Sequence, residues 1–109
     1  MSSFTWEWYA EVERRVAELL RLARQRLADD ELKRGRPQRA LEIAREMIAA
    51  DEFDESAREL AIRAHLLIGD VAEGRREFRR YRDLLLRELS TEPAASLAAL
   101  LKTEDSPEL

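Results

Sequence analysis

The 109-residue sequence contains no cysteine and only three glycines and three prolines. The absence of cysteine excludes disulfide bridges, thiolate metal sites and a cysteine nucleophile, and it fits a reducing compartment. Apolar runs such as Leu66–Ile68 and Leu84–Leu86 are far shorter than the ~20 residues that cross a bilayer. The first residues carry neither the basic patch nor the apolar segment of a secretory signal. We therefore expect a cytoplasmic protein that makes no membrane contact.

The sequence also lacks a strong charge of either sign. Its 19 basic and 23 acidic residues leave a net charge of −4, which argues against a general attraction to nucleic acid. Apolar residues make up 45% of the chain, enough for a buried core beneath a charged surface. The length fits one domain, which we expect to span residues 1–109.

Apolar residues recur at steps of three and four along the chain, which is typical of α-helices, and no alternating pattern of a β-strand is present. In the first segment, Tyr9, Val12, Val16, Leu19, Ala23 and Leu27 recur at these steps, which places them on one face of a helix. Glycine, proline and aspartate divide the chain into five expected helices, followed by a frayed tail at 103–109. The helices are expected at about 5–33, 37–50, 54–68, 71–89 and 93–102. The sequence therefore predicts an all-α fold.

The most informative feature of the sequence is a repeat. Gly35 and Gly69 are 34 residues apart, each between two expected helices, and Ala40 and Gly74 follow five residues after each glycine. This period is that of tetratricopeptide repeats, in which a small residue lies where the two helices of a pair approach most closely. A glycine within a helix costs about 1 kcal/mol relative to alanine, so Gly74 indicates a packing reason. We expect a tetratricopeptide-like right-handed superhelix of antiparallel helix pairs, with Ala40 and Gly74 as packing residues.

Two segments, 35–57 and 69–93, resemble the bacterial transcriptional activator domain of SARP-type regulators. The most specific part is the aromatic and arginine-rich stretch Phe78–Arg82, which continues through Leu85–Leu89 to Glu92 and Pro93 before a last helix. The resemblance covers nearly the whole chain. It implies an all-helical, tetratricopeptide-like module that works in transcriptional activation through protein contacts.

The sequence departs from the family pattern at three places. Glu52 stands where proline is usual, Gly74 where alanine is usual, and Ser90 and Thr91 where glycine and valine are common. These changes bear on turn geometry more than on the fold. Regulators of this family carry a winged-helix DNA-binding domain ahead of the module, and these 109 residues contain none. The resemblance therefore implies an excised domain or a small stand-alone relative that binds no promoter specifically on its own.

Residues with catalytic chemistry are few. His65 is the only histidine, and no cysteine or positioned base accompanies it. The acidic link at 51–55 has two interpretations, a divalent cation site or helix capping. It lacks the glycine and the alternating oxygen ligands of a calcium loop, which favours capping. No glycine-rich phosphate loop is present. We expect no enzyme, no metal site and no cofactor.

The fourth expected helix carries six arginines within 13 residues: Arg75, Arg76, Arg79, Arg80, Arg82 and Arg87. At 100° per residue, Arg75, Arg79 and Arg82 flank the apolar seam of this helix, whereas the other three point away from it. One interpretation is a solvated face moderated by neighbouring carboxylates. The other is a recognition stripe for an acidic partner or a phosphate backbone, because guanidinium groups form paired hydrogen bonds with carboxylates and phosphates.

Four of the seven aromatic residues lie near the start, at Phe4, Trp6, Trp8 and Tyr9. The spacing of Trp6 and Tyr9 places both on one face, which we expect to pack inward, leaving Trp8 exposed. The cluster forms either a lid on the domain's own helices or a docking surface for a second copy or a neighbouring domain.

Together these features predict a protein-interaction module. Its concave surface, lined by the first helix of each pair, is expected to present Arg24, Glu31, Arg58 and His65. Such a surface is expected to bind a peptide or helix of a partner. The family resemblance implies that this partner belongs to the transcription machinery or to an attached DNA-binding domain. One alternative is an oligomerisation or regulatory adaptor that forms a homodimer, and another is direct nucleic-acid binding by the arginines. The expected partner-binding residues are Trp8, Arg24, Arg58, His65, Arg75, Arg79 and Arg82.

Overall fold

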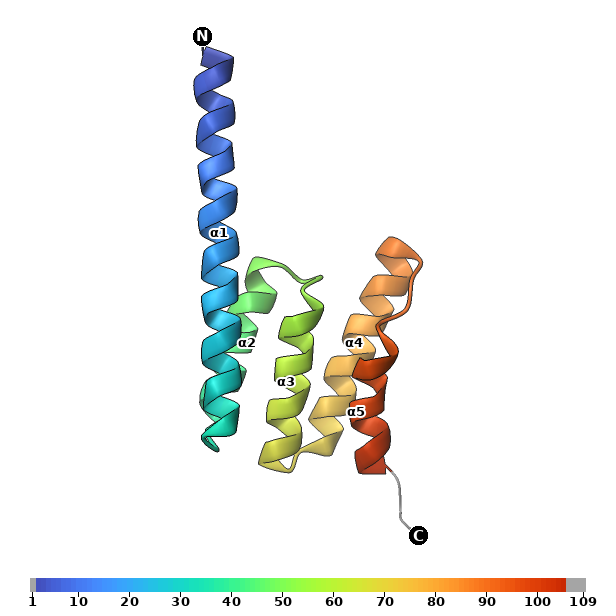
Figure 1. Ribbon diagram of the computed structural model, residues 1–109. Coiled ribbons are helices and arrows are strands. Elements are labelled where there is room, and N and C mark those ends of the chain that lie inside the picture. Colours follow the sequence, from blue (N-terminus) through green and yellow to red (C-terminus); the bar gives the residue numbers. More distant parts are fainter. Residues whose placement is uncertain (1, 106–109) are drawn as a thin grey trace.

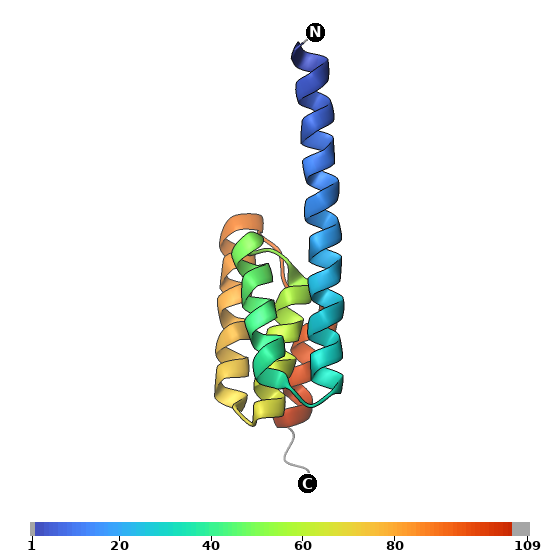
Figure 2. The same ribbon diagram turned by 90° about the vertical axis from the view of Figure 1, so that its left-hand side faces the viewer.

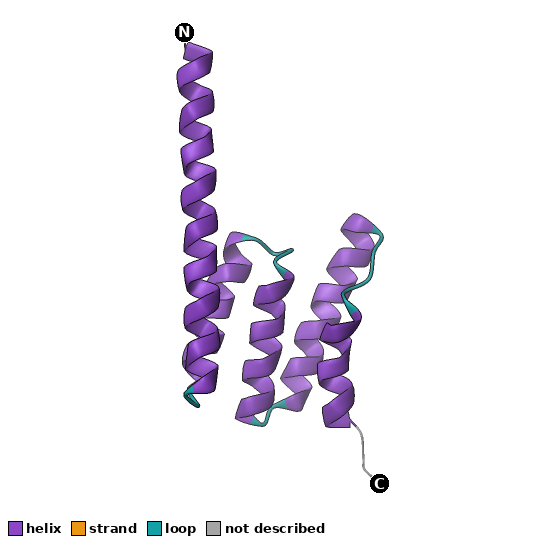
Figure 3. Cartoon of the chain, in the orientation of Figure 1, coloured by secondary structure: helices purple, strands orange, loops and turns teal. Residues whose placement is uncertain are grey.

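The computed structural model describes residues 2–105, with side chains from residue 5 to residue 102. Within this range the chain is all-helical, as expected, and the helix bounds lie within three residues of the predicted ones (Figures 1 and 3). The helices are α1 (Ser2–Lys33), α2 (Pro37–Ala50), α3 (Glu55–Ile68), α4 (Val71–Leu89) and α5 (Ala95–Asp105). The expected tail begins later than predicted, because α5 continues through residues 103–105; residues 106–109 lie outside the described range.

Glycine and aspartate set the turns that the sequence indicates. Gly35 and Gly69 adopt φ values of +74° and +95°, a left-handed conformation that glycine takes at little cost. Asp54 and Asp70 cap α3 and α4, and each carboxylate accepts a hydrogen bond of 3.2 Å from the backbone amide three residues later. These short connections make α1 and α2, and then α3 and α4, antiparallel pairs.

Helix α3 is the centre of the bundle and contacts each of the other four helices. Figure 2 shows α1 and α5 on one side of α3, and α2 and α4 on the other. Two apolar clusters hold the bundle together. The first joins α1, α2 and α3 through Ala28, Leu32, Ala40, Leu41, Ala44, Met47, Ala57, Leu60, Ala61 and Ala64. The second joins α3, α4 and α5 through Ile62, Tyr81, Leu85, Leu97 and Leu101.

The two small residues of the repeat lie in helix contacts. Ala40 is fully buried, and Gly74 is buried against α3 and α5. A Cβ atom at position 74 would lie 3.6 Å from side-chain atoms of Leu66 and Leu101 and 3.8 Å from the Cβ atom of His65. These are ordinary van der Waals distances. Close packing therefore does not require glycine at position 74, contrary to the expectation from the sequence.

Replacing Gly74 with alanine is expected to raise the free energy of unfolding by about 0.5–1 kcal/mol, because alanine favours the helix and its methyl group fits. Urea denaturation measures this change. Gly69→Ala is the matched control, and it should lower stability because φ is +95° there. Loss of stability in Gly74→Ala would mean that α3, α4 and α5 approach more closely than the structure shows.

Helix α1 is more than twice as long as its partner α2, with 32 residues against 14. At 1.5 Å per residue these lengths are about 48 Å and about 21 Å. Since the chain reverses directly after α1, the amino-terminal part of α1 extends beyond the bundle, as Figure 1 shows. The radius of gyration is accordingly 16.6 Å, against about 13 Å for a compact domain of this size.

The prediction that Trp6 and Tyr9 pack inward is wrong. Trp6 is 71% exposed and Tyr9 is 55% exposed, and the side chains of Val16 and Leu19 also face solvent. For the overhanging part of α1, the physical reason is the length mismatch, because none of the other described helices reaches it. Alongside the bundle, Leu27 is exposed because it lies on a different side of α1 from the buried Ala28. The side of α1 that packs on the bundle is instead the one that carries Ala28, which is fully buried. The side chain of Phe4 lies outside the described residues.

Candidate interaction surface

Exposed apolar side chains gather on α1. Nine large ones on this helix have exposed fractions of 40% or more: Trp6, Trp8, Tyr9, Val12, Val16, Leu19, Leu20, Leu22 and Leu27. Fully exposed aromatic side chains offer about 150–250 Å² each, so the set presents on the order of 800 Å² of accessible area. Monomeric proteins rarely expose contiguous apolar patches larger than a few hundred Å². An exposed apolar surface of this size is therefore unusual for a monomeric protein.

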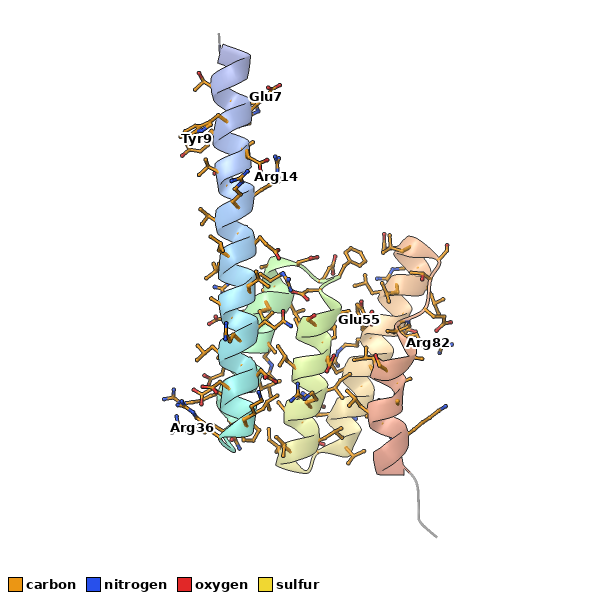
Figure 4. The ribbon with its side chains drawn as sticks, viewed as in Figure 1. Glu7, Tyr9, Arg14, Arg36, Glu55 and Arg82 are labelled. Carbon is orange, nitrogen blue, oxygen red and sulfur yellow. The ribbon has the colours of Figure 1, made fainter. Side chains whose placement is uncertain are left out.

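Most of these residues lie on the side of α1 that faces away from the bundle, whereas Leu20 and Leu22 line grooves between α1 and the bundle. At 100° per residue the stripe is roughly opposite Ala28 and Leu32, which are buried in the core. Figure 4 shows Tyr9 pointing away from the bundle, whereas Glu7 and Arg14 project from the other side of the helix. We call this surface the apolar stripe. It comprises Tyr9, Val12, Val16, Leu19, Ala23 and Leu27, flanked by Trp6, Trp8, Leu20 and Leu22.

Glu11, in the overhanging part of α1, forms ion pairs with two arginines of the same helix. Glu11 pairs with Arg14 and, at 3.0 Å, with Arg15. Hydrogen bonds from these two guanidinium groups lower the pKa of Glu11. The overhanging part of α1 therefore combines an apolar side with a charged side, on which Glu11 pairs with Arg14 and Arg15.

The groove expected on the first helices of each pair is not open. Glu31, Arg58 and His65 are only 6–7% exposed, so the expectation that they face a partner is corrected. Arg58 and His65 lie on sides of α3 that its neighbouring helices cover. Glu31 lies near the end of α1, where it pairs with Arg36 and Arg39. Arg24 is partly exposed and lies 3.6 Å from Glu46. Trp8, another residue expected to contact a partner, is 61% exposed.

Arg58 instead forms a buried network. Its Nη1 donates a 2.7 Å hydrogen bond to Glu77 Oε2, and its Nη2 donates one of 2.9 Å to the carbonyl oxygen of Glu52. Its guanidinium carbon lies 5.2 Å from the centroid of the Tyr81 ring, within the range of a cation–π contact. Arg58 thus ties α3 to α4 and to the turn before α3.

Tyr81 extends this network to the start of α5. Its hydroxyl donates a 2.8 Å hydrogen bond to Glu55 Oε1, and the other oxygen of Glu55 accepts one of 3.0 Å from the amide of Ala94. Burial, followed by the hydrogen bond to Glu55, raises the pKa of Tyr81, so the phenol stays protonated as a donor. No local sequence pattern indicates this network, because its links between different helices join residues 19 to 39 positions apart.

The arginines of α4 are largely paired with nearby carboxylates. Arg76 lies 2.7 Å from Glu73 and Arg80 lies 3.4 Å from Glu77. Arg87 lies 3.2 Å from Glu88.

Two of the three arginines that flank the seam, Arg79 and Arg82, are exposed, and Arg75 is partly exposed. Arg82 lies 3.0 Å from Glu92, and the hydrogen bond to this carboxylate raises the pKa of the guanidinium. The pairing along α4 favours the interpretation of a solvated face over a stripe that collects phosphates.

A groove of about 520 Å³ lies where α1 leaves the bundle. It is lined by residues that include Leu20, Arg21, Arg24, Met47, Ala50 and Asp54. Arg21 lies 3.0 Å from Glu18 and 3.7 Å from Asp54, and the hydrogen bond to Glu18 raises the pKa of Arg21. The guanidinium of Arg21 is thus engaged by the chain's own carboxylates.

The acidic link between α2 and α3 serves the backbone. Asp51 accepts a 3.0 Å hydrogen bond from the amide of Phe53, and Asp54 caps α3. In the part of the chain that the structure describes, no three histidine, cysteine, aspartate or glutamate side chains gather closely enough to hold a metal ion. Over the same residues, no helix combines the length and apolar character needed to cross a membrane.

Comparison with known proteins gives one match. The family described as "Bacterial transcriptional activator domain" matches residues 3–103, which cover all five helices almost completely. No curated protein and no solved structure shows a significant match to the chain.

Proposed function

Because the chain belongs to the bacterial transcriptional activator domain family, we propose that it serves transcriptional regulation as a protein-interaction module. The observation that carries this proposal is the apolar stripe of α1 with its flanking aromatic residues. Exposed aromatic and aliphatic side chains that line one face of a helix are typical of protein interfaces. The family is regulatory, and we propose that the chain has no catalytic activity of its own.

The proposed partners are proteins of the transcription machinery or an attached DNA-binding domain. Since bacterial transcription takes place in the cytoplasm, we propose that the chain acts there. Direct DNA binding is less well supported, because most arginines of α4 are paired with carboxylates and the net charge is −4. The isolated chain is therefore expected to leave duplex DNA unretarded in a gel-shift assay, even at ~50 mM salt, where phosphate contacts are strong. Salt-sensitive retardation would favour the nucleic-acid interpretation.

A reporter assay tests the proposed function. The chain is fused to an unrelated, constitutively dimeric DNA-binding domain, whose operator lies upstream of a weak bacterial promoter. We expect several-fold more transcription than with the DNA-binding domain alone, because the fused module contacts the transcription machinery. No increase by a fusion that is expressed, folded and bound to its operator would overturn the proposal. The dimeric carrier makes this result independent of any self-association by the chain.

A further inference from the structure

The apolar stripe has the spacing of a coiled-coil seam. Tyr9, Val12, Val16, Leu19 and Ala23 follow one another at alternating steps of three and four residues. This seven-residue repeat, with two apolar positions in each unit, is the pattern by which α-helices pair through knobs-into-holes packing. A surface of this kind fits another helix that carries a similar seam.

We propose that the partner of the apolar stripe is a second copy of this chain, so that two α1 helices pair along their exposed faces. This inference rests on the proposed function of an interaction module: it assigns the apolar stripe to pairing of two modules, and contacts with the transcription machinery then fall to the other surfaces of the pair. The same seam is present on both copies, so a two-fold axis brings the two seams together: each residue faces its counterpart in a parallel pair, and the two ends of the seam face each other in an antiparallel pair. Both directions of pairing satisfy this condition.

The geometry of the domain permits this contact. The apolar stripe faces away from the bundle (Figure 4), so two paired α1 helices carry their bundles on opposite outer sides. The stripe runs from Tyr9 to Leu27, a distance of about 27 Å at 1.5 Å per residue. Its lower part lies alongside the bundle yet stays exposed, with Leu27 at 51%. A second helix can therefore follow the stripe over its whole length.

The exposed area is sufficient for a stable dimer. A standard protein interface buries about 800 Å² on each partner, and the nine exposed side chains of α1 present an area of that order. Leu20 and Leu22 flank the seam and widen the contact. Arg14 and Arg15 already pair with Glu11 of their own helix, so they bring little uncompensated charge to the contact. Pairing of two copies removes the large apolar surface from water.

Sedimentation equilibrium of the full chain over a wide concentration range tests the pairing. We expect the apparent mass to rise from 12.7 kDa to twice that value. Leu19→Glu, at a position 66% exposed in the single chain, should raise the dissociation constant at least about a hundredfold, because an unpaired carboxylate would be buried in the seam. The matched control is Leu89→Glu, at a site 55% exposed near the end of α4. This control should leave the dissociation constant unchanged.

Three results would overturn the inference: a mass of 12.7 kDa at every concentration, association that Leu19→Glu does not weaken, or an equal loss in both variants. Circular dichroism of each variant shows whether the helices remain formed. Since the reporter assay supplies its own dimeric carrier, a monomeric chain would contradict the pairing without deciding the proposed function. A silent reporter would contradict the proposed function without deciding the pairing.

Discussion

Replacement of Arg58 with alanine is expected to lower the free energy of unfolding by about 3 kcal/mol or more. The guanidinium is buried and holds Glu77 at 2.7 Å, so truncation leaves a carboxylate with only 11% side-chain exposure and without its main partner. Glu77 then keeps only its 3.4 Å ion pair with the more exposed Arg80, and a buried carboxylate that loses its main counter-charge is strongly destabilising. The variant also loses the hydrogen bond to the turn before α3 and the contact with Tyr81.

Urea denaturation of Arg58→Ala, Glu77→Ala and the double variant measures this effect. The two single losses should not add, because the second truncation removes the charge that the first left unpaired. Arg79→Ala, at an exposed position on α4, is the control and should change stability by less than about 0.5 kcal/mol. Equal, small losses at Arg58 and Arg79 would contradict a structural role for Arg58 and restore the expectation that it faces a partner.

Leu97→Ala is expected to lower the free energy of unfolding by about 3 kcal/mol, the usual cost of leaving a cavity at a buried leucine. Leu97 is 2% exposed and belongs to the cluster that holds α5 against α3 and α4. Helix α5 has only 11 residues, which is too short for stability in isolation. Its backbone amides should therefore exchange much faster with solvent in the variant.

The control for this change is Leu89→Ala, at the exposed end of α4, which should cost less than about 0.5 kcal/mol. Denaturation measures the global effect, and hydrogen exchange by mass spectrometry measures the effect on α5. If Leu97→Ala proves no more harmful than Leu89→Ala, α5 is not an integral part of the bundle.

The turns and the fold class were predictable because short-range chemistry determines them. A left-handed glycine followed by an aspartate cap is recognisable within a few residues, as at Gly69 and Asp70. The 34-residue offset between Gly35 and Gly69 then indicates that the same hairpin occurs twice. Both inferences need only the residue types at the turns and the number of residues between them.

The direction of the apolar stripe was not predictable from periodicity alone. Periodicity shows which residues share a face, but the neighbouring helices decide whether that face is covered. A sequence signal for the exposure did exist. The first expected helix, 5–33, is about twice as long as the second, 37–50, and an antiparallel partner of half the length leaves the rest of the first helix uncovered.

The burial of Arg58 and His65 also could not be predicted from the sequence. Both residues lie on the central helix, where all four neighbours contribute cover, and that arrangement depends on how the two hairpins stack. Arg58 meets Glu77 across 19 positions, and Glu55 meets Ala94 across 39. Pairings of this kind follow from the tertiary fold and have no local sequence pattern.

The domain leaves the apolar stripe of its own α1 exposed, and in our proposal a second copy of the chain covers it. A single thiol placed at Leu19→Cys tests both parts, because the chain has no other cysteine. Its alkylation rate, measured against chain concentration, should match that of Leu89→Cys in dilute solution and fall as the concentration rises. Slow alkylation at every concentration would show that the domain covers its own α1, and fast alkylation at every concentration would show that no second copy binds there.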